Sequence, residues 1–200
     1  MNGKDGKPFK TRDGGVMSLK NLIELVNNET YKRIVNESIS EEEKQEISKI
    51  VGMAALKYAD LLPFRGTDYV FEVEKFADLE GKTGPYLLYS TIRMKSLLNK
   101  ANYTDGTITK LNSTTEKDIA LTLLELPNVL DRSLNTKTLN EIAEYLYKLT
   151  SLYNKFYSEN HIINEEDKDL KESRLTLTSI VHKTNLLLLD ILGIEVPEKM

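Results

Sequence analysis

The feature that most constrains the fold of this chain is a helical spacing of apolar residues, repeated in successive segments that begin or end at helix-terminating signals. Ser18 can cap a first helix that runs to about residue 35. Ser40 with Glu43 has the capping-box spacing, and Pro63 stops the helix that follows. The apolar positions of these two helices recur every three or four residues, at Leu22, Ile23, Val26, Ile34, Ile47, Ile50, Val51, Ala54, Ala55, Tyr58 and Leu61.

The same signals predict helices over the rest of the chain. Gly84-Pro85 opens one, because proline at the first helical position loses no hydrogen bond. Residues 102–115, rich in Thr, Asn and Gly, indicate a loop, and a helix from Glu116 to about residue 126 is ended or kinked by Pro127.

Two more helices complete the expected set. Thr138 and Glu141 have the spacing of a second capping box. Asn164 is the expected cap of a last long helix, and Gly193 stands where a left-handed C-terminal glycine belongs. Tyr69-Val-Phe-Glu-Val could be a short strand or an irregular crossing. The predicted fold is therefore mainly α, a helical bundle with at most a short β element near the N-terminus or around residue 70.

Composition excludes several classes of protein. The 200 residues are 40% apolar and 29% charged, which is typical of one sizeable soluble domain, alone or with an appendage. Cysteine is absent, so disulfides and thiolate sites are excluded. The polar N-terminus lacks a signal-peptide core, and the longest apolar run, residues 186–189, cannot span a bilayer. We expect a cytoplasmic protein without a membrane partner.

The net charge of −4 argues against binding of nucleic acid, DNA included, through bulk positive charge. Basic residues are nevertheless concentrated locally, in residues 1–15 and in the helix after Pro85, where Arg93, Lys95 and Lys100 occur without an intervening acid. Such a patch could contact phosphates or could be a solvated helix face. The charges alone leave both interpretations open.

The sequence lacks the residue patterns by which a chain could catalyse a reaction on its own. His161 and His182 are the only histidines, and neither has a neighbour at metal-ligand spacing, so no metal site is expected. No nucleophile elbow or Walker-type loop is present. The glycine-punctuated loop 6–15, with Lys7 and Lys10, could wrap a polyphosphate or could be an ordinary mobile terminus.

Tyrosines offer a second kind of binding surface. Tyr86 and Tyr89 lie beside the basic patch, and Tyr157 follows in a tyrosine-rich helix. Aromatic rings stack on unpaired bases while neighbouring cations hold the backbone. Other tyrosines belong to the core, as we expect of Tyr145 and Tyr153.

Several blocks of the sequence resemble one known family. GKDGKPFKTRDGG, VGMAALKYADL, TDYVFEVEKFADLEGKTGPYLLYSTIRM, FYSEN and LGIEVPEKM are similar, in order and spacing, to the C-terminal landmarks of arginyl-tRNA synthetases. The resemblance covers the whole chain. It implies the end of a class I catalytic domain over residues 1–36, a connecting helix and crossing segment over 37–80, and over 81–200 the helical anticodon-binding domain named for its Asp-Ala-Leu-Arg motif.

The resemblance also implies site residues. Phe9, Lys10, Thr11 and Arg12 take the place of the Lys-Met-Ser-Lys-Ser loop that steadies ATP phosphates. The Asp-Ala-Leu-Arg motif is altered, with residues 54–57, Ala-Ala-Leu-Lys, as its nearest counterpart. The resemblance implies base contacts at Tyr89, Tyr157 and Met200. From their charge and position in the sequence, Arg93 and Lys95 are expected to contact phosphates, and Tyr86, beside this basic patch, is a further expected tRNA contact.

The function implied is recognition of the tRNA(Arg) anticodon arm within an arginine–tRNA ligase, which joins arginine to tRNA at the expense of ATP. The family's His-Ile-Gly-His motif is not in these 200 residues, so the chain alone is expected to be inactive, to bind no cofactor, and to need the catalytic domain as a partner. A helical protein–protein interaction module is the alternative. A small phosphotransfer enzyme is a poorer one, because no acid, base or metal set accompanies the loop.

Overall fold

The computed structural model describes residues 18–35, 39–70 and 72–200. Within these ranges the chain is helical and contains no β-strand, so the prediction of a mainly α fold is confirmed. The helices, in order, are α1 (Leu19–Arg33), α2 (Glu41–Leu61), α3 (Val73–Phe76), α4 (Gly84–Lys100), α5 (Thr114–Leu124), α6 (Leu126–Thr136), α7 (Asn140–Glu159), the 3₁₀ turn η1 (Ile162–Asn164) and α8 (Lys168–Ile191).

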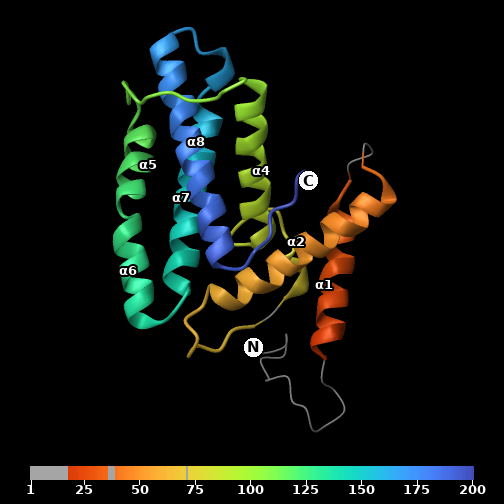
Figure 1. Cartoon of the computed structure of the whole chain (residues 1–200). Helices are drawn as coiled ribbons and strands as arrows, with labels where there is room; N and C mark the ends of the chain where they lie inside the picture. Colours follow the sequence, from red (N-terminus) through yellow and green to blue (C-terminus); the bar gives the residue numbers. More distant parts are fainter. Residues whose placement is uncertain (1–17, 36–38, 71) are drawn as a thin grey trace.

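Helices α4 to α8 form a bundle, and α1 and α2 lie beside it, with α2 running obliquely across its lower end in Figure 1. Helix α7 contacts α4, α5, α6 and α8 and is therefore the central helix of the bundle. The core consists of fully buried side chains from these helices, including Leu87, Leu88, Ile119, Leu146, Leu149, Phe156 and Leu188. Its apolar positions follow the helical spacing of the sequence.

Helix α2 joins the bundle to α1 because it buries two faces. One face contributes Val51 and Tyr58 to the bundle core, and the Tyr58 hydroxyl donates to the Ala143 carbonyl of α7 at 3.0 Å. The other face packs Ala55 and Ala59 against α1 in a second, smaller cluster. A helix buried on two sides fixes the relative position of the parts that it contacts.

Most predicted helix ends are confirmed. The Ser18 hydroxyl caps α1, and Ser40 and Glu43 form the full capping box of α2. Pro127 lies in the first turn of α6 and separates α6 from α5. Gly193 has a φ of +66°, the left-handed conformation expected after the last helix.

Two predicted caps are wrong. Thr138 does not cap α7, whose N-cap is Leu139 without a side-chain hydrogen bond; the Thr138 hydroxyl instead lies 2.8 Å from that of Thr136. Asn164 ends η1, and the Asp167 carboxylate caps α8 through the backbone N–H groups of residues 169 and 170. Helix α8 is therefore capped by a different local residue than expected, whereas α7 begins without a side-chain cap.

Around residue 70 the described residues form no strand: Val70 is an isolated bridge residue, and the short helix α3 begins three residues later, at Val73. Val73 and Phe76, three residues apart, pack against the α1–α2 cluster. This tertiary contact favours a helical turn, because residues three apart lie on the same helix face. The division into segments 1–36, 37–80 and 81–200 stays a prediction.

Gly84 allows α4 to begin directly against α2. A Cβ atom at Gly84 would lie 2.3 Å from the Ala54 carbonyl oxygen and 2.8 Å from the Ala55 nitrogen. Both are backbone atoms of a buried helix and cannot move aside. We expect Gly84→Ala to lower the free energy of unfolding by about 1–3 kcal/mol, measured by urea denaturation.

Gly66→Ala is the control for this prediction. A Cβ atom there would meet only the exposed Phe64 ring, at 3.1 Å, and that ring can turn away. An unchanged denaturation midpoint for Gly84→Ala would contradict the close packing of α4 on α2.

Candidate nucleic-acid interface

A polar seam runs between α4 and α7. On α4, Tyr86, Ser90 and Arg93 are spaced four and three residues apart and so share one helix face. Asn154 of α7 faces all three. Its amide nitrogen donates to the Tyr86 hydroxyl at 2.7 Å and to the Ser90 hydroxyl at 2.8 Å, and its oxygen accepts from Arg93 at 2.5 Å. The Tyr86 hydroxyl also lies 3.3 Å from that of Ser151.

The Arg93 guanidinium lies between two tyrosine rings. Its central carbon is 4.6 Å from the Tyr157 ring centroid and 5.5 Å from that of Tyr89, within the range of cation–π attraction. Tyr89 is 43% exposed and Tyr157 is partly buried. The two rings therefore belong to one continuous surface of the bundle.

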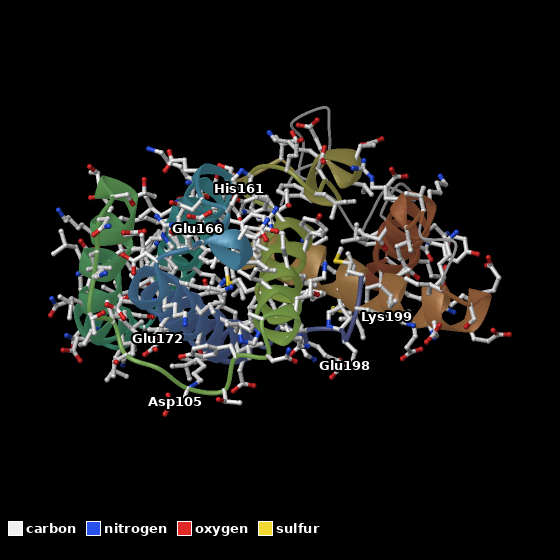
Figure 2. All side chains as sticks on the ribbon, turned by 90° about the horizontal axis from the view of Figure 1, so that it is seen from above. Asp105, His161, Glu166, Glu172, Glu198 and Lys199 are labelled. Atoms are coloured by element: carbon white, nitrogen blue, oxygen red, sulfur yellow. The ribbon has the colours of Figure 1, made fainter. Side chains whose placement is uncertain are left out.

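The C-terminal tail borders this surface. Met200 and Tyr89 line a cavity of about 310 Å³ whose other walls are largely apolar. The tail is held at three points: Lys57 donates to the Gly193 carbonyl, Lys95 pairs with Glu198, and Lys199 pairs with Glu43 at 2.9 Å. Figure 2 shows Glu198 and Lys199 on the tail between α4 and α2.

Charged side chains lie along the edge of α4 next to the tail. Burial lowers the pKa of His182, and the charges of Lys95 and Lys183 lower it further. The histidine is therefore neutral near pH 7, and the charges of this region are those of Lys183 and of the Lys95–Glu198 ion pair. Lys95 in turn holds the pKa of the Glu198 carboxyl below its usual range.

The structure places the predicted site residues as follows. Tyr89, Arg93 and Tyr157 form the continuous surface just described, which we call the tyrosine face, and Met200 borders it through the cavity that it shares with Tyr89. Lys95 lies at its edge, paired with Glu198. Tyr86 lies mostly within the seam, where its ring packs 5.8 Å from that of Tyr147. Phe9, Lys10, Thr11 and Arg12 fall outside the described residues. Tyr145 and Tyr153 are buried, as expected of core tyrosines.

Asn154 is the residue of this region that the sequence did not single out. The sequence did contain a signal for it: Ser151, Asn154 and Tyr157 recur at three-residue spacing in a helix whose other inward positions are mostly apolar or aromatic. A polar stripe opposite a second polar stripe indicates an interhelical hydrogen-bond network. Only the pairing of α4 with α7 shows that the two stripes meet.

Among residues 18–35, 39–70 and 72–200, no group of three or more His, Cys, Asp or Glu side chains could hold a metal ion. None of the helices in these ranges has the length and apolar character needed to cross a membrane.

Comparison with known families gives two matches. Residues 87–200 match the DALR anticodon binding domain, and residues 1–73 match the catalytic domain of class I tRNA synthetases of the arginine type. The tyrosine face lies within the first match.

Curated relatives and solved structures agree with these matches. Arginine–tRNA ligases of Alkaliphilus oremlandii and Agathobacter rectalis are 41% and 35% identical to the chain over its full length. The chain spans 35% and 36% of these relatives, about a third of their length.

The fold also resembles solved arginyl-tRNA synthetases. That of Thermus thermophilus has a TM-score of 0.85 at 24% identity, over 94% of this chain and 33% of its own. That of Plasmodium falciparum has a TM-score of 0.81 at 25% identity, over 92% and 34%. The chain therefore belongs to the family of the DALR anticodon-binding domain, and over its full length it is similar to about a third of each arginine–tRNA ligase.

Proposed function

We propose that this chain binds the anticodon arm of tRNA(Arg) as part of an arginine–tRNA ligase, which uses ATP to join arginine to its tRNA. The observation that carries the proposal is the tyrosine face. In it the rings of Tyr89 and Tyr157 both contact the Arg93 guanidinium, and Met200 borders the same surface. All of these residues lie within the segment that matches an anticodon-binding domain.

The chemistry of this face suits an unpaired loop. Tyrosine rings and a polarisable thioether stack on bases of any sequence, and each base–aromatic stack contributes about 1–3 kcal/mol. Lys95 lies at the edge of the face, where it can reach a phosphate, and Arg93 adds positive charge between the rings. A local patch of this kind attracts RNA although the whole chain is acidic.

The direct test is a binding assay with an unmodified tRNA(Arg) anticodon stem-loop, followed by fluorescence anisotropy at fixed salt. The control RNA has the same stem closed by a loop of abasic nucleotides, so that the phosphates are equal in both RNAs and only the unpaired bases differ. We expect the native loop to bind about tenfold more tightly, equivalent to roughly one stacked base. Equal affinity for both RNAs would contradict the proposal and favour a helical protein-binding module instead.

ATP and the catalytic domain enter the proposal through residues 1–73. Phe9, Lys10, Thr11 and Arg12, which lie outside the described residues, are proposed to steady ATP phosphates, as the family resemblance implies. Adenylate formation requires arginine and ATP to be held in line. Because the chain spans only a third of its relatives, we expect no arginine-dependent pyrophosphate exchange from the chain alone. We propose a cytoplasmic location for the whole ligase.

The pairing of Lys95 with Glu198 gives a prediction about charge. An RNA phosphate that binds Lys95 must displace the Glu198 carboxylate, whose side chain is 89% exposed. We expect Glu198→Gln to raise stem-loop affinity by about two- to fivefold, the range of a surface ion pair. Anisotropy titrations at several salt concentrations measure this gain.

Glu43→Gln is the matched control, because it removes the carboxylate that pairs with the other tail lysine, Lys199, and glutamine keeps the capping box. An equal gain for both variants would mean that net charge alone, rather than release of Lys95, is responsible.

A further inference from the structure

Both the nitrogen and the oxygen of the Asn154 side-chain amide form hydrogen bonds within the seam between α4 and α7. The amide nitrogen donates to two hydroxyls, those of Tyr86 and Ser90, and the oxygen accepts from Arg93. This orientation of the amide is chemically determined: a guanidinium can only donate, so the oxygen must face Arg93, whereas both hydroxyls can accept from the nitrogen.

Apart from the hydrogen bond to Asn154, few polar contacts fix the position of the Arg93 side chain. Its Nε atom is buried without a hydrogen-bond partner, and no carboxylate of the described residues pairs with it. An arginine side chain has about 2 kcal/mol of rotamer entropy, which favours many extended positions in solvent over a single one. The hydrogen bond to Asn154 at 2.5 Å therefore selects the position in which the guanidinium contacts both tyrosine rings.

We propose that Asn154 is a positioning residue: it holds Arg93 between Tyr89 and Tyr157, so that the two rings present fixed faces to the unpaired bases of the RNA. The inference rests on the proposed function and deepens it. Asn154 itself touches no base and acts through Arg93. Arg93 then serves mainly to orient the rings, and a role as a simple phosphate contact is the competing outcome.

Holding the tyrosine rings in their bound orientation before RNA arrives should raise the affinity for RNA. A ring that is already held in its bound orientation loses less conformational freedom when a base stacks on it. Of the two rings, Tyr89 is the more exposed, at 43%, and therefore loses more conformational freedom when a base stacks on it. Removal of the Asn154 anchor frees the guanidinium and with it the outer ring.

The first test is a double-mutant cycle with the native anticodon stem-loop. We expect Asn154→Leu, which keeps the side-chain volume, to weaken binding about 5- to 10-fold in the wild-type background. In the Arg93→Ala background the same change should weaken binding less than about twofold, because residues that act as a unit are not additive. Equal losses in both backgrounds, or no loss in a folded variant, would overturn the proposal.

Ser90→Ala is the matched control. It removes one hydrogen bond of Asn154 but leaves the contact with Arg93, so binding should stay within about twofold of wild type. Arg93→Ala distinguishes the competing role through salt: loss of a phosphate contact flattens the salt dependence by about one unit of slope, whereas loss of ring orientation leaves the slope unchanged. A flattened slope would assign Arg93 to phosphate and overturn its role as an orienting residue.

A second test needs no RNA and separates this inference from the proposed function. In the free chain, the Nε–H proton of Arg93 should be shifted upfield by ring currents and exchange slowly, as seen by nitrogen-15 NMR. Asn154→Leu should abolish both properties, whereas Asn154→Asp, which keeps the acceptor, and Ser90→Ala should retain them. An unchanged resonance in Asn154→Leu would overturn the positioning role. Failure of the wild-type chain to prefer the native loop would instead overturn the proposed function.

Discussion

Arg174→Ala is expected to lower the free energy of unfolding by about 3–5 kcal/mol, the effect of leaving a buried charge without its partner. Arg174 of α8 donates through Nε to Glu116 of α5 at 2.8 Å and through Nη1 to Glu165 at 2.6 Å. The Glu116 side chain is fully buried. Its other oxygen accepts from the backbone N–H groups of residues 112 and 113. Loss of Arg174 therefore leaves an ionised carboxylate inside the bundle.

The effect should depend on pH. Burial raises the pKa of Glu116, but the backbone N–H of Ser113 and the Arg174 guanidinium more than offset it, and the net shift is downward. A lowered pKa means that the carboxylate stabilises the fold at neutral pH and that this contribution is lost as pH falls through the folded-state pKa. The difference between wild type and Arg174→Ala should therefore shrink in acid.

Urea denaturation at pH 7 and at acidic pH measures both effects. Arg132→Ala is the control, because Arg132 forms an exposed pair with Glu141. An exposed pair contributes only about 0–1 kcal/mol. If the two arginine variants lost equal stability, the Glu116–Arg174 pair would not be the buried link between α5 and α8 that its geometry indicates.

Tyr89→Ala is expected to weaken binding of the anticodon stem-loop by about 5- to 150-fold, the equivalent of one lost base stack. Tyr157→Ala should fall in the same range. Tyr89 is exposed, so its removal should leave the unfolding midpoint almost unchanged. Tyr157 packs 6.3 Å from the ring of Tyr153, and its removal should also cost some stability. Anisotropy titrations beside thermal melts separate the two effects.

Tyr89→Phe is the matched variant for this prediction. It removes the hydroxyl but keeps the ring, and should bind RNA within about twofold of wild type if stacking is the interaction. Stable alanine variants with undiminished affinity would show that the tyrosine face is not the RNA surface. A loss equal in the phenylalanine and alanine variants would assign the contact to the hydroxyl instead.

Local sequence determined the helices themselves. Apolar spacing of three and four residues located most of them, and short-range signals such as Ser40 with Glu43, Pro127 and Gly193 fixed many of their ends. These predictions succeeded because a cap or a break depends on residues three or four positions apart. The resemblance to arginyl-tRNA synthetases singled out Tyr89, Tyr157 and Met200, which helical periodicity alone would not, and their contact with RNA stays a prediction.

Tertiary structure alone decided the rest. Thr138 has the spacing of a capping box but does not cap α7, and residues 73–76 form a helix because two side chains meet the α1–α2 cluster. Asn154 lies 61 residues from Arg93, and Arg174 lies 58 residues from Glu116. Such contacts depend on how α4 meets α7 and how α5 meets α8. The sequence fixes the faces that helices bury, but partners far apart along the chain are selected by the packing of the whole bundle.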